Sequence, residues 1–277
     1  MARQFTRTEE IERSINRKYR KTLWAPFVKA VHEYELISPG DRIAVCISGG
    51  KDSMCMAKLF QQYRKLNDIP FETEFLVLDP GYSEANRERI LHNLDTLGIP
   101  ARILPARIFD YVDLQKGNPC YLCARMRRGY LYSYAKEAGC NKIALGHHFN
   151  DVIETTLMGM FYSSKLETMV PKLKSLNFEG MELIRPMYMV HEESIISWAA
   201  YNDLHFLQCA CRLTEKSVTG EMDSKRKEIK DLLQDLKKKN PEIEHNIFQA
   251  LHAVQIETFP GYKAEGSLHS FLENYDK

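Results

Sequence analysis

Long apolar runs are missing from this sequence. No apolar stretch in its 277 residues approaches the ~18 residues that a membrane-spanning helix needs, so we expect no membrane association. The first residues, 1–7, also lack the apolar core of a secretory signal peptide. Without a secretion signal, the seven cysteines are not expected to form disulfides. These absences together predict a cytoplasmic protein.

The ordinary nucleotide-binding loop is missing too. No Walker A motif is present, in which four residues separate a glycine from Gly-Lys, so an ordinary P-loop NTPase is excluded. Instead, a buried-strand pattern at residues 43–47 leads into Ser48-Gly-Gly-Lys-Asp-Ser53 and then into an apolar helical run. Paired glycines let backbone N–H groups approach an oxyanion closely, and the helix N-terminus adds the positive end of its dipole.

The side chains of this loop suit a phosphate ligand. Lys51 offers a point charge, Asp52 is a candidate Mg²⁺ ligand and catalytic residue, and two serines add hydroxyl groups. We therefore predict an ATP site made of Ser48, Gly49, Gly50, Lys51, Asp52 and Ser53.

Net charge is nearly absent, at +1 from 38 basic and 37 acidic side chains. The basic residues nevertheless gather in three places, within residues 3–29, 125–128 and 165–174. Each such run alone is most often a solvated surface. Three of them beside an ATP site are consistent with an RNA-binding surface.

Strand-like and helix-like patterns alternate along the chain. Strands are expected at residues 43–47, 71–79, 101–104, 142–146 and 183–186. Helices are expected at 24–36, 84–97, 124–138, 152–161 and 191–203, with another ending near residue 65. This alternation implies parallel pairing and an α/β fold with a doubly wound sheet.

The chain is expected to have three parts. Residues 1–38 form an N-terminal helical arm, 39–212 the ATP-binding domain with the cysteine site, and 213–277 a C-terminal helical extension. Within the extension we expect helices at 221–239 and 247–256 and an irregular tail from Phe259. No internal repeat or low-complexity linker is present.

Ligands of open parallel sheets bind at the carboxyl ends of the strands. Besides the loop at residues 48–53, two expected strand ends carry marked residues, in the turn after Asp79 and at residues 146–151. Gly146 can add a backbone contact to the nucleotide, and Asp151 is a second candidate catalytic carboxylate. The adjacent histidines, His147 and His148, fit hydrogen-bonded loop positions better than a catalytic base.

Four cysteines are candidates for a metal or sulfur site. Cys120 and Cys123 have metal-ligand spacing just before an expected helix, a position that favours thiolates. Cys209 and Cys211 can complete the site through the fold. A four-thiolate zinc site, a three-thiolate [4Fe–4S] cluster with one reactive iron and a metal-free persulfide relay all stay open. The remaining cysteines fit small core positions: Cys46, Cys55 and Cys140.

The sequence resembles one family over much of its length. The matching segments are Gly40–Ser53, Cys120–Tyr132, Lys142–His148, Met160–Tyr162, Pro171–Leu173 and Ile184–Pro186. On these segments the chain is similar to the tRNA-cytidine 2-sulfurtransferases (the TtcA family) of PP-loop ATP-pyrophosphatases. The similarity runs from about Val31 through Tyr201 and continues more weakly to the C-terminal helices.

The resemblance implies a fold, a reaction and a ligand set. The fold is the adenine-nucleotide α-hydrolase-like sheet. ATP and Mg²⁺ adenylate the C2 oxygen of cytidine 32 in tRNA, and sulfur from a cysteine desulfurase or another donor then replaces AMP through a [4Fe–4S] cluster. AMP and diphosphate are released. By position, the implied cluster ligands are Cys120, Cys123 and Cys209, with Cys211 as the alternative third ligand.

Two departures from the family pattern bear on the acceptor. Cys209-Ala-Cys211 replaces a Cys-x-x-Cys pair, and Asn150 replaces the first aspartate of Gly-His-His-x-Asp-Asp. Another nucleoside or a small metabolite therefore stays open as the acceptor, and so does a non-catalytic nucleotide- or RNA-binding protein. The absence of further flanking Cys-x-x-Cys pairs argues against thiouridine enzymes with zinc-finger ends. Isoacceptors, sulfur donor and a homodimeric state are left open.

Overall fold

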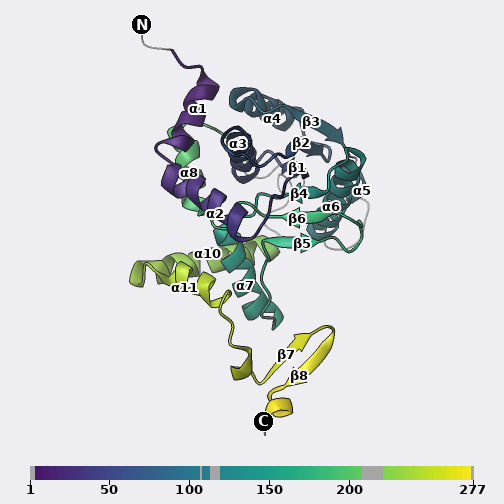
Figure 1. The fold of residues 1–277 in the computed structure, drawn as a ribbon, viewed down its shortest axis with the longest axis vertical. Helices are drawn as coiled ribbons and strands as arrows, with labels where there is room; N and C mark the ends of the chain where they lie inside the picture. The colour runs from purple at the N-terminus through teal and green to yellow at the C-terminus, as the bar shows by residue number, and fades with distance from the viewer. Residues whose placement is uncertain (1–3, 107, 113–118, 208–220, 276–277) are drawn as a thin grey trace. The chain divides into compact units, whose positions relative to one another are not determined.

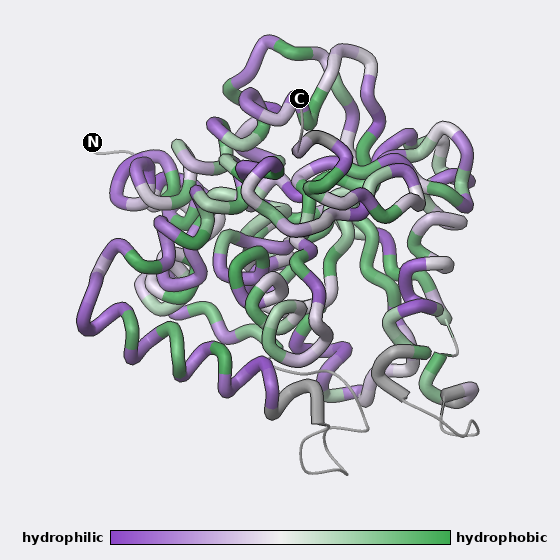
Figure 2. Tube along the Cα trace, turned by 90° about the horizontal axis from the view of Figure 1, so that it is seen from below, coloured by the Kyte–Doolittle hydropathy of each residue, from purple (hydrophilic) through white to green (hydrophobic). Residues whose placement is uncertain are grey.

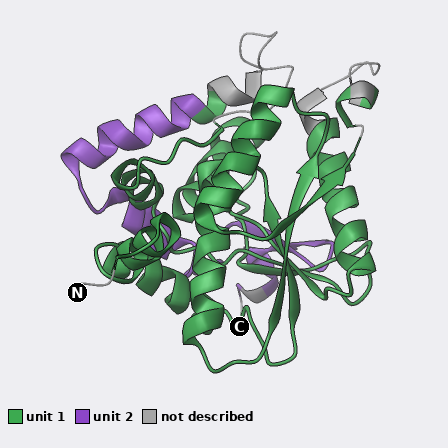
Figure 3. Ribbon diagram, turned by 90° about the horizontal axis from the view of Figure 1, so that it is seen from above, with its two compact units in different colours: residues 1–226 green, residues 227–277 purple. Residues whose placement is uncertain are grey.

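The computed structural model describes these parts of the 277-residue chain: residues 4–106, 108–112, 119–207 and 221–275. The chain forms two compact units, residues 1–226 and 227–277, which Figure 3 colours separately. The domain boundaries expected after residues 38 and 212 stay predictions, and the second lies outside the described residues.

A six-stranded sheet with the order β3-β2-β1-β4-β6-β5 is the frame of the first unit. Its parallel strands are β1 (Arg42–Ile47), β2 (Glu72–Asp79), β3 (Ala101–Pro105), β4 (Lys142–Ala144) and β6 (Glu182–Ile184). The expected α/β class with a doubly wound sheet is confirmed. The strand order reverses between β1 and β4, which makes this point of the sheet a candidate ligand site.

One strand of this six-stranded sheet was not expected. The edge strand β5 (Lys172–Lys174) pairs antiparallel with β6. Its three residues, Lys-Leu-Lys, are too few to give a recognisable alternation of polar and apolar positions.

Helices cover both faces of the sheet (Figure 1). On one face lie α1 (Arg7–Asn16), α2 (Ala25–Glu33), α3 (Lys51–Leu66), α4 (Glu84–Leu97) and α8 (Glu192–Tyr201). On the other lie α5 (Ile108–Val112) and α6 (Pro119–Glu137), and α7 (Phe149–Ser163) follows β4 along the chain. Figure 2 shows the apolar residues concentrated in the central strands, as expected for parallel strands covered on both faces.

Two helices begin earlier than the sequence predicted. α6 begins at Pro119 rather than residue 124, because proline is favoured at the first helical position, so Cys120 and Cys123 lie inside the helix. α7 begins at Phe149 rather than residue 152. Its start is set by a reciprocal cap in which His148 and Asp151 each bond the other's backbone N–H, so Asp151 belongs to a helix and not to a loop.

The N-terminal helix packs on the core. Ile11 and Ile15 of α1 are fully buried. Glu12 accepts a hydrogen bond of 2.8 Å from Lys58 of α3, whose side chain is fully buried and also donates to the carbonyl oxygen of Leu97. A buried ammonium group needs such partners, so this contact fixes α1 on α3.

We expect Glu12→Gln to lower the free energy of unfolding by about 3 kcal/mol, because it leaves the buried Lys58 ammonium without its carboxylate partner. Glu10→Gln on the same helix is the matched control. Glu10 pairs with Arg7 at 3.7 Å on the exposed surface, and such pairs contribute less than about 1 kcal/mol. Urea denaturation compares the variants, and equal losses would contradict this role of Glu12.

The second unit contains most of α10 (Glu221–Lys239), with α11 (Ile243–Ala250) and a hairpin of β7 (Gly261–Ala264) and β8 (Ser267–Ser270). The expected irregular tail is therefore wrong. Glu265 and Gly266 form the turn with φ of 51° and 81°, and Glu-Gly is not one of the usual hairpin signals such as Asn-Gly. None of the helices in the described ranges combines the length and apolar character needed to cross a bilayer.

Candidate active site

The loop between β1 and α3 has a shape that requires glycine. Gly49 has φ of +86°, and a Cβ there would lie 2.8 Å from the Ile90 side chain. Ser53 Oγ accepts the backbone N–H of Ser48 at 3.0 Å and donates to the carbonyl oxygen of Gly50 at 3.0 Å. No described side chain caps the start of α3, so the helix N-terminus can receive an anion.

Gly146 lets the end of β4 approach this loop closely. A Cβ at Gly146 would lie 3.1 Å from the backbone nitrogen of Ser53 and 3.2 Å from the carbonyl carbon of Asp52. Those are backbone atoms at the start of α3, so they cannot move aside as a flexible side chain would. The close approach brings the Gly146 segment and the ATP loop together, as the sequence predicted.

We expect Gly146→Ala to weaken ATP binding at least about tenfold, because the added methyl group must push the first turn of α3 out of position. Gly129→Ala is the control. A Cβ at Gly129, in α6, would have open space within 4 Å, so alanine there should be neutral or stabilise the helix by up to about 1 kcal/mol. Calorimetric titration with ATP measures the effect, and equal affinities would contradict it.

Lys51 lies between two carboxylates. Its Nζ donates to Asp52 Oδ2 at 3.1 Å and to Glu192 Oε1 at 2.9 Å. Burial lowers the pKa of Lys51, but the two carboxylates outweigh this effect and raise it overall, so the side chain is a cation. Glu192 was missed by sequence reasoning, because it lies 141 positions away and carries no motif.

Carboxylates converge on His148. Its Nε2 lies 3.7 Å from Asp52, 3.5 Å from Asp151 and 3.9 Å from Glu192. Because Nδ1 accepts the backbone N–H of Asp151, the proton of a neutral ring lies on Nε2 and faces these oxygens. Burial raises the pKa of Asp151, yet the interactions of its carboxylate with the His148 ring, the His148 backbone N–H and Arg226 lower it overall. Ionised carboxylate oxygens are the donors that Mg²⁺ prefers, so this set fits the metal.

Arg226 lies beside two carboxylates of α7. Its guanidinium lies 3.5 Å from Asp151 and 3.7 Å from Glu154, a carboxylate with only 2% exposure. Both acids come from the first turns of α7, one helical turn apart. Arg226 was not singled out from the sequence, since the lysine- and glutamate-rich run around it is typical of a solvated helix.

A cavity of about 380 Å³ opens at the carboxyl ends of β1, β2 and β4, beside α6. Its apolar wall includes Ile47, Leu78, Leu131, Ile143 and Leu145. Its polar wall includes Ser48, Asp52, Ser53, Arg127, Arg128, Gly146, His147 and Asp151. The volume suits a small-molecule site, and the mixture of an apolar pocket with an anion-binding loop fits a purine nucleotide.

His147 is a neutral group on this wall. Burial lowers the pKa of His147 to about 4, with smaller contributions from Arg185 and other nearby cations, and Asp151 opposes the shift. Its Nδ1 is buried and has no hydrogen-bond partner among the described residues. A bound ligand can supply that partner.

The turn after β2 supports the loop from the side. Asp79 accepts the backbone N–H groups of Gly81 at 2.9 Å and Tyr82 at 2.8 Å, and Arg87 bonds its other oxygen. Burial raises the pKa of Asp79, but these donors lower it overall. Tyr82 Oη then donates to the carbonyl oxygen of Ser48 at 3.2 Å, so the second expected strand end positions the ATP loop.

A larger cavity of about 1220 Å³ lies on the other side of the loop, between the ends of α4 and α8. Lys51 lines this cavity and not the smaller one, and Asp52 lines both. The backbone N–H of Leu207 donates to the carbonyl oxygen of Gly49 at 3.2 Å. Leu207, the last residue of this described segment, therefore lies beside the ATP loop.

The described residues include two of the four candidate ligand cysteines. Cys120 and Cys123 lie three positions apart in the first turns of α6, and Cys123 is 8% exposed. Cys209 and Cys211 lie outside the described residues. The core positions expected for Cys46, Cys55 and Cys140 are confirmed, and burial raises the pKa of Cys46 to about 12.

Comparisons with known proteins identify the family of this chain. A family model described as the PP-loop domain matches residues 11–213. A tRNA-cytidine(32) 2-sulfurtransferase of Geobacter metallireducens is 34% identical over 231 residues, covering 82% of this chain and 87% of that protein. One of Neisseria meningitidis serogroup C is 36% identical over 263 residues, covering 92% and 78%.

Among solved structures, the U34-tRNA thiolase NcsA of Methanococcus maripaludis with its [4Fe–4S] cluster superposes with a TM-score of 0.64. It is 21% identical in sequence and covers 95% of this chain and 84% of the thiolase, so the likeness bears on the fold. The ATP loop, its parallel sheet and the close sequence relatives lead to one assignment. This chain belongs to the PP-loop ATP-pyrophosphatases and, among them, to the tRNA-cytidine(32) 2-sulfurtransferase family.

Proposed function

We propose that this protein is an ATP-dependent tRNA sulfurtransferase that converts cytidine, at position 32, to 2-thiocytidine. The observation that carries the proposal is the shared wall of the 380 Å³ cavity, where the ATP loop faces α6. The same helix carries Cys120 and Cys123 in its first turns. Nucleotide activation and sulfur delivery therefore have residues on neighbouring elements.

In this proposal the adenosine occupies the apolar part of the cavity, and the phosphates lie on the loop at residues 48–53. Backbone N–H groups at the start of α3 and the Lys51 ammonium stabilise the negative charge of the phosphates. Asp52 and Asp151 are the residues that would hold Mg²⁺, which would neutralise part of the phosphate charge.

The first step is adenylation. The C2 oxygen of cytidine attacks the α-phosphorus of ATP, the bond between the α-phosphorus and the bridging oxygen breaks, and diphosphate leaves with that electron pair. Donors fixed in advance around the phosphates stabilise the charge that develops on them. In the second step a sulfide-level sulfur nucleophile bonds to C2, and the C2–oxygen bond breaks, so that AMP leaves with the electron pair of that bond. A persulfide donor supplies sulfur at this level when a thiol or another two-electron reductant cleaves its S–S bond.

Sulfur delivery is assigned to the cysteines. Cys120, Cys123 and Cys209 are the proposed thiolate ligands, with Cys211 as the alternative third ligand. Two thiolates one turn apart on α6 fit such a site. These cysteines would hold a [4Fe–4S] cluster, which would supply the sulfur-transfer chemistry. The sulfur itself comes from a cysteine desulfurase or another donor.

The acceptor is proposed to be tRNA in the cytoplasm. Arg127 and Arg128 of α6 line the cavity, and the basic side chains of Lys172 and Lys174 lie on the edge strand β5. Such groups can hold the phosphate backbone near the site, which makes binding depend on salt. A homodimer is an open part of this proposal.

The Asn150 departure does not favour another acceptor. Asn150 is only 8% exposed, and its Oδ1 accepts the backbone N–H of Glu192 at 3.0 Å. The residue therefore joins α7 to α8 inside the protein. No feature of the described residues favours a small metabolite or a purely binding role over tRNA thiolation.

A direct test measures release of AMP and diphosphate from ATP with and without tRNA that lacks 2-thiocytidine. The proposal expects stimulation by this tRNA and little stimulation by free nucleosides or small metabolites. A rate of AMP and diphosphate release that does not change when tRNA is added would contradict tRNA as the acceptor. ATP binding without AMP and diphosphate release, whichever acceptor is added, would indicate a protein that only binds nucleotide.

A further inference from the structure

Lys51 has a carboxylate partner that comes from outside the ATP loop. Glu192 Oε1 accepts from Lys51 Nζ at 2.9 Å, and the two side chains are only 20% and 28% exposed. Asp52 is the other partner at 3.1 Å. One cation between two carboxylates has a net charge of −1, at the place where a polyanion is proposed to bind.

Glu192 is fixed in this position by its backbone. It lies in the first turn of α8, where the helix dipole favours a carboxylate. Its N–H donates to Oδ1 of the buried Asn150 at 3.0 Å. The carboxylate is therefore delivered to Lys51 by a rigid junction of α7 and α8.

We propose that Glu192 is a positioning residue: it holds Lys51 as its counter-ion before ATP binds, and the phosphates of ATP displace it. The inference rests on the proposed function, because it takes the loop at residues 48–53 as the phosphate site. It adds that the phosphate site contains a carboxylate, Glu192, that repels the phosphate ligand. Phosphate binding must break the contact between Lys51 and Glu192, and release of diphosphate restores it.

The direction of the effect follows from charge. Glu192→Gln keeps the size of the side chain and an acceptor oxygen for Lys51, but it removes the negative charge that repels phosphate. We expect diphosphate to bind this variant about fivefold more tightly than the wild type in the absence of divalent metal, since like charges repel strongly in a partly buried site. A residue with a merely structural role would give no gain in affinity.

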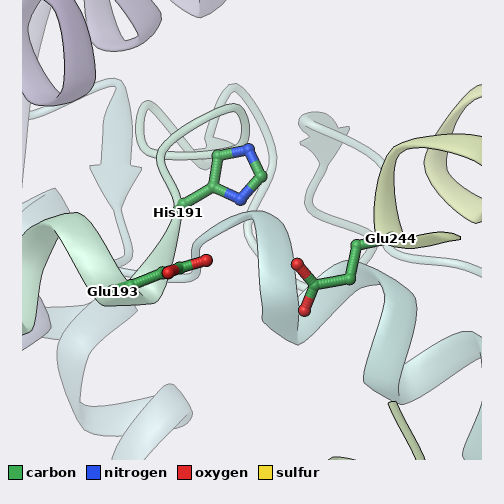
Figure 4. Close-up of side chains that lie close together, drawn as sticks. All are labelled: His191, Glu193 and Glu244. Carbon is green, nitrogen blue, oxygen red and sulfur yellow. The ribbon is translucent and has the colours of Figure 1, made fainter. Parts of the chain in front are cut away.

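Two further variants frame this result. Glu193→Gln removes the next carboxylate on α8. Glu193 is exposed, and a carboxylate oxygen of its side chain lies within 4.8 Å of a ring nitrogen of His191 (Figure 4). This variant should leave diphosphate affinity unchanged. Glu192→Asp retains the charge on a side chain that is one methylene shorter. It should give an affinity between those of the wild type and Glu192→Gln.

The experiment is calorimetric titration of the full chain with diphosphate in EDTA, with thermal melting to show that each variant is folded. Tighter binding by Glu192→Gln, with Glu193→Gln at the wild-type value, supports the proposal. Unchanged binding by Glu192→Gln would overturn the proposal and leave Glu192 with a merely structural role. Weaker binding would also overturn it and would make Glu192 a group that assists phosphate binding. A wild type that binds neither diphosphate nor ATP would remove the proposed function itself.

Discussion

Lys51→Ala is expected to reduce the release of AMP and diphosphate by at least about 10³-fold, because a preorganised cation at the transferring phosphate is lost from a partly buried site. The change also leaves Asp52 and Glu192 without the ammonium group between them, which adds repulsion against the incoming phosphates. Asp52→Ala should have a similar effect, through loss of a proposed Mg²⁺ ligand. A release assay with saturating tRNA measures both.

Arg64→Ala is the matched control for the Lys51 variant. Arg64 is an exposed cation near the C-terminal end of the same helix, α3. Its removal changes the net charge equally but leaves the loop intact, so turnover should stay within about twofold of wild type, as for most surface substitutions. Turnover by Lys51→Ala close to that of Arg64→Ala would show that the phosphates bind elsewhere.

Cys120→Ala is expected to abolish formation of 2-thiocytidine and the AMP release that accompanies it, while diphosphate release in the adenylation step persists. The ATP loop comes from β1 and α3, whereas Cys120 lies on α6, so activation of the acceptor does not need the thiolate. Protein purified without oxygen should be brown, with absorbance near ~400 nm from the iron–sulfur cluster, and the variant should lose this colour. The split between the two activities separates a sulfur-delivery role from general damage.

Cys140→Ala is the matched control, because Cys140 is a buried cysteine outside the proposed ligand set. It should keep both colour and thiolation. Cys209→Ala and Cys211→Ala then identify the third ligand by which of them loses the colour. Colourless wild-type protein that contains zinc would exclude the iron–sulfur cluster. Loss of diphosphate release in Cys120→Ala would contradict the separation of the two steps.

The sequence was most informative where the residues of a site follow one another in the chain. The strand, loop and helix around residues 48–53 could be predicted because glycines, a lysine and hydroxyl groups follow one buried strand directly. The assignment of ATP to this loop stays a prediction. The parallel sheet could be predicted because each of its main strands is bounded by helical patterns. The start of α6 was predicted too late, since Pro119 was taken as part of the preceding loop.

Contacts between distant segments were beyond sequence reasoning. Glu192 reaches Lys51, and Arg226 reaches Asp151, only through the tertiary structure around the strand ends. An acid near a helix start and an arginine in a charged run are ordinary features of solvated helices. Asn150 could be recognised as a departure from the family pattern, but its bond to the backbone of Glu192 depends on the tertiary structure.

The central claim is that this chain thiolates cytidine in tRNA. The most direct measurement is mass spectrometry of nucleosides from total tRNA in cells with and without the gene. We expect 2-thiocytidine to disappear on deletion and to return with the wild-type gene but not with Cys120→Ala. Unchanged 2-thiocytidine in the deletion strain would contradict the claim and assign the ATP site to another acceptor.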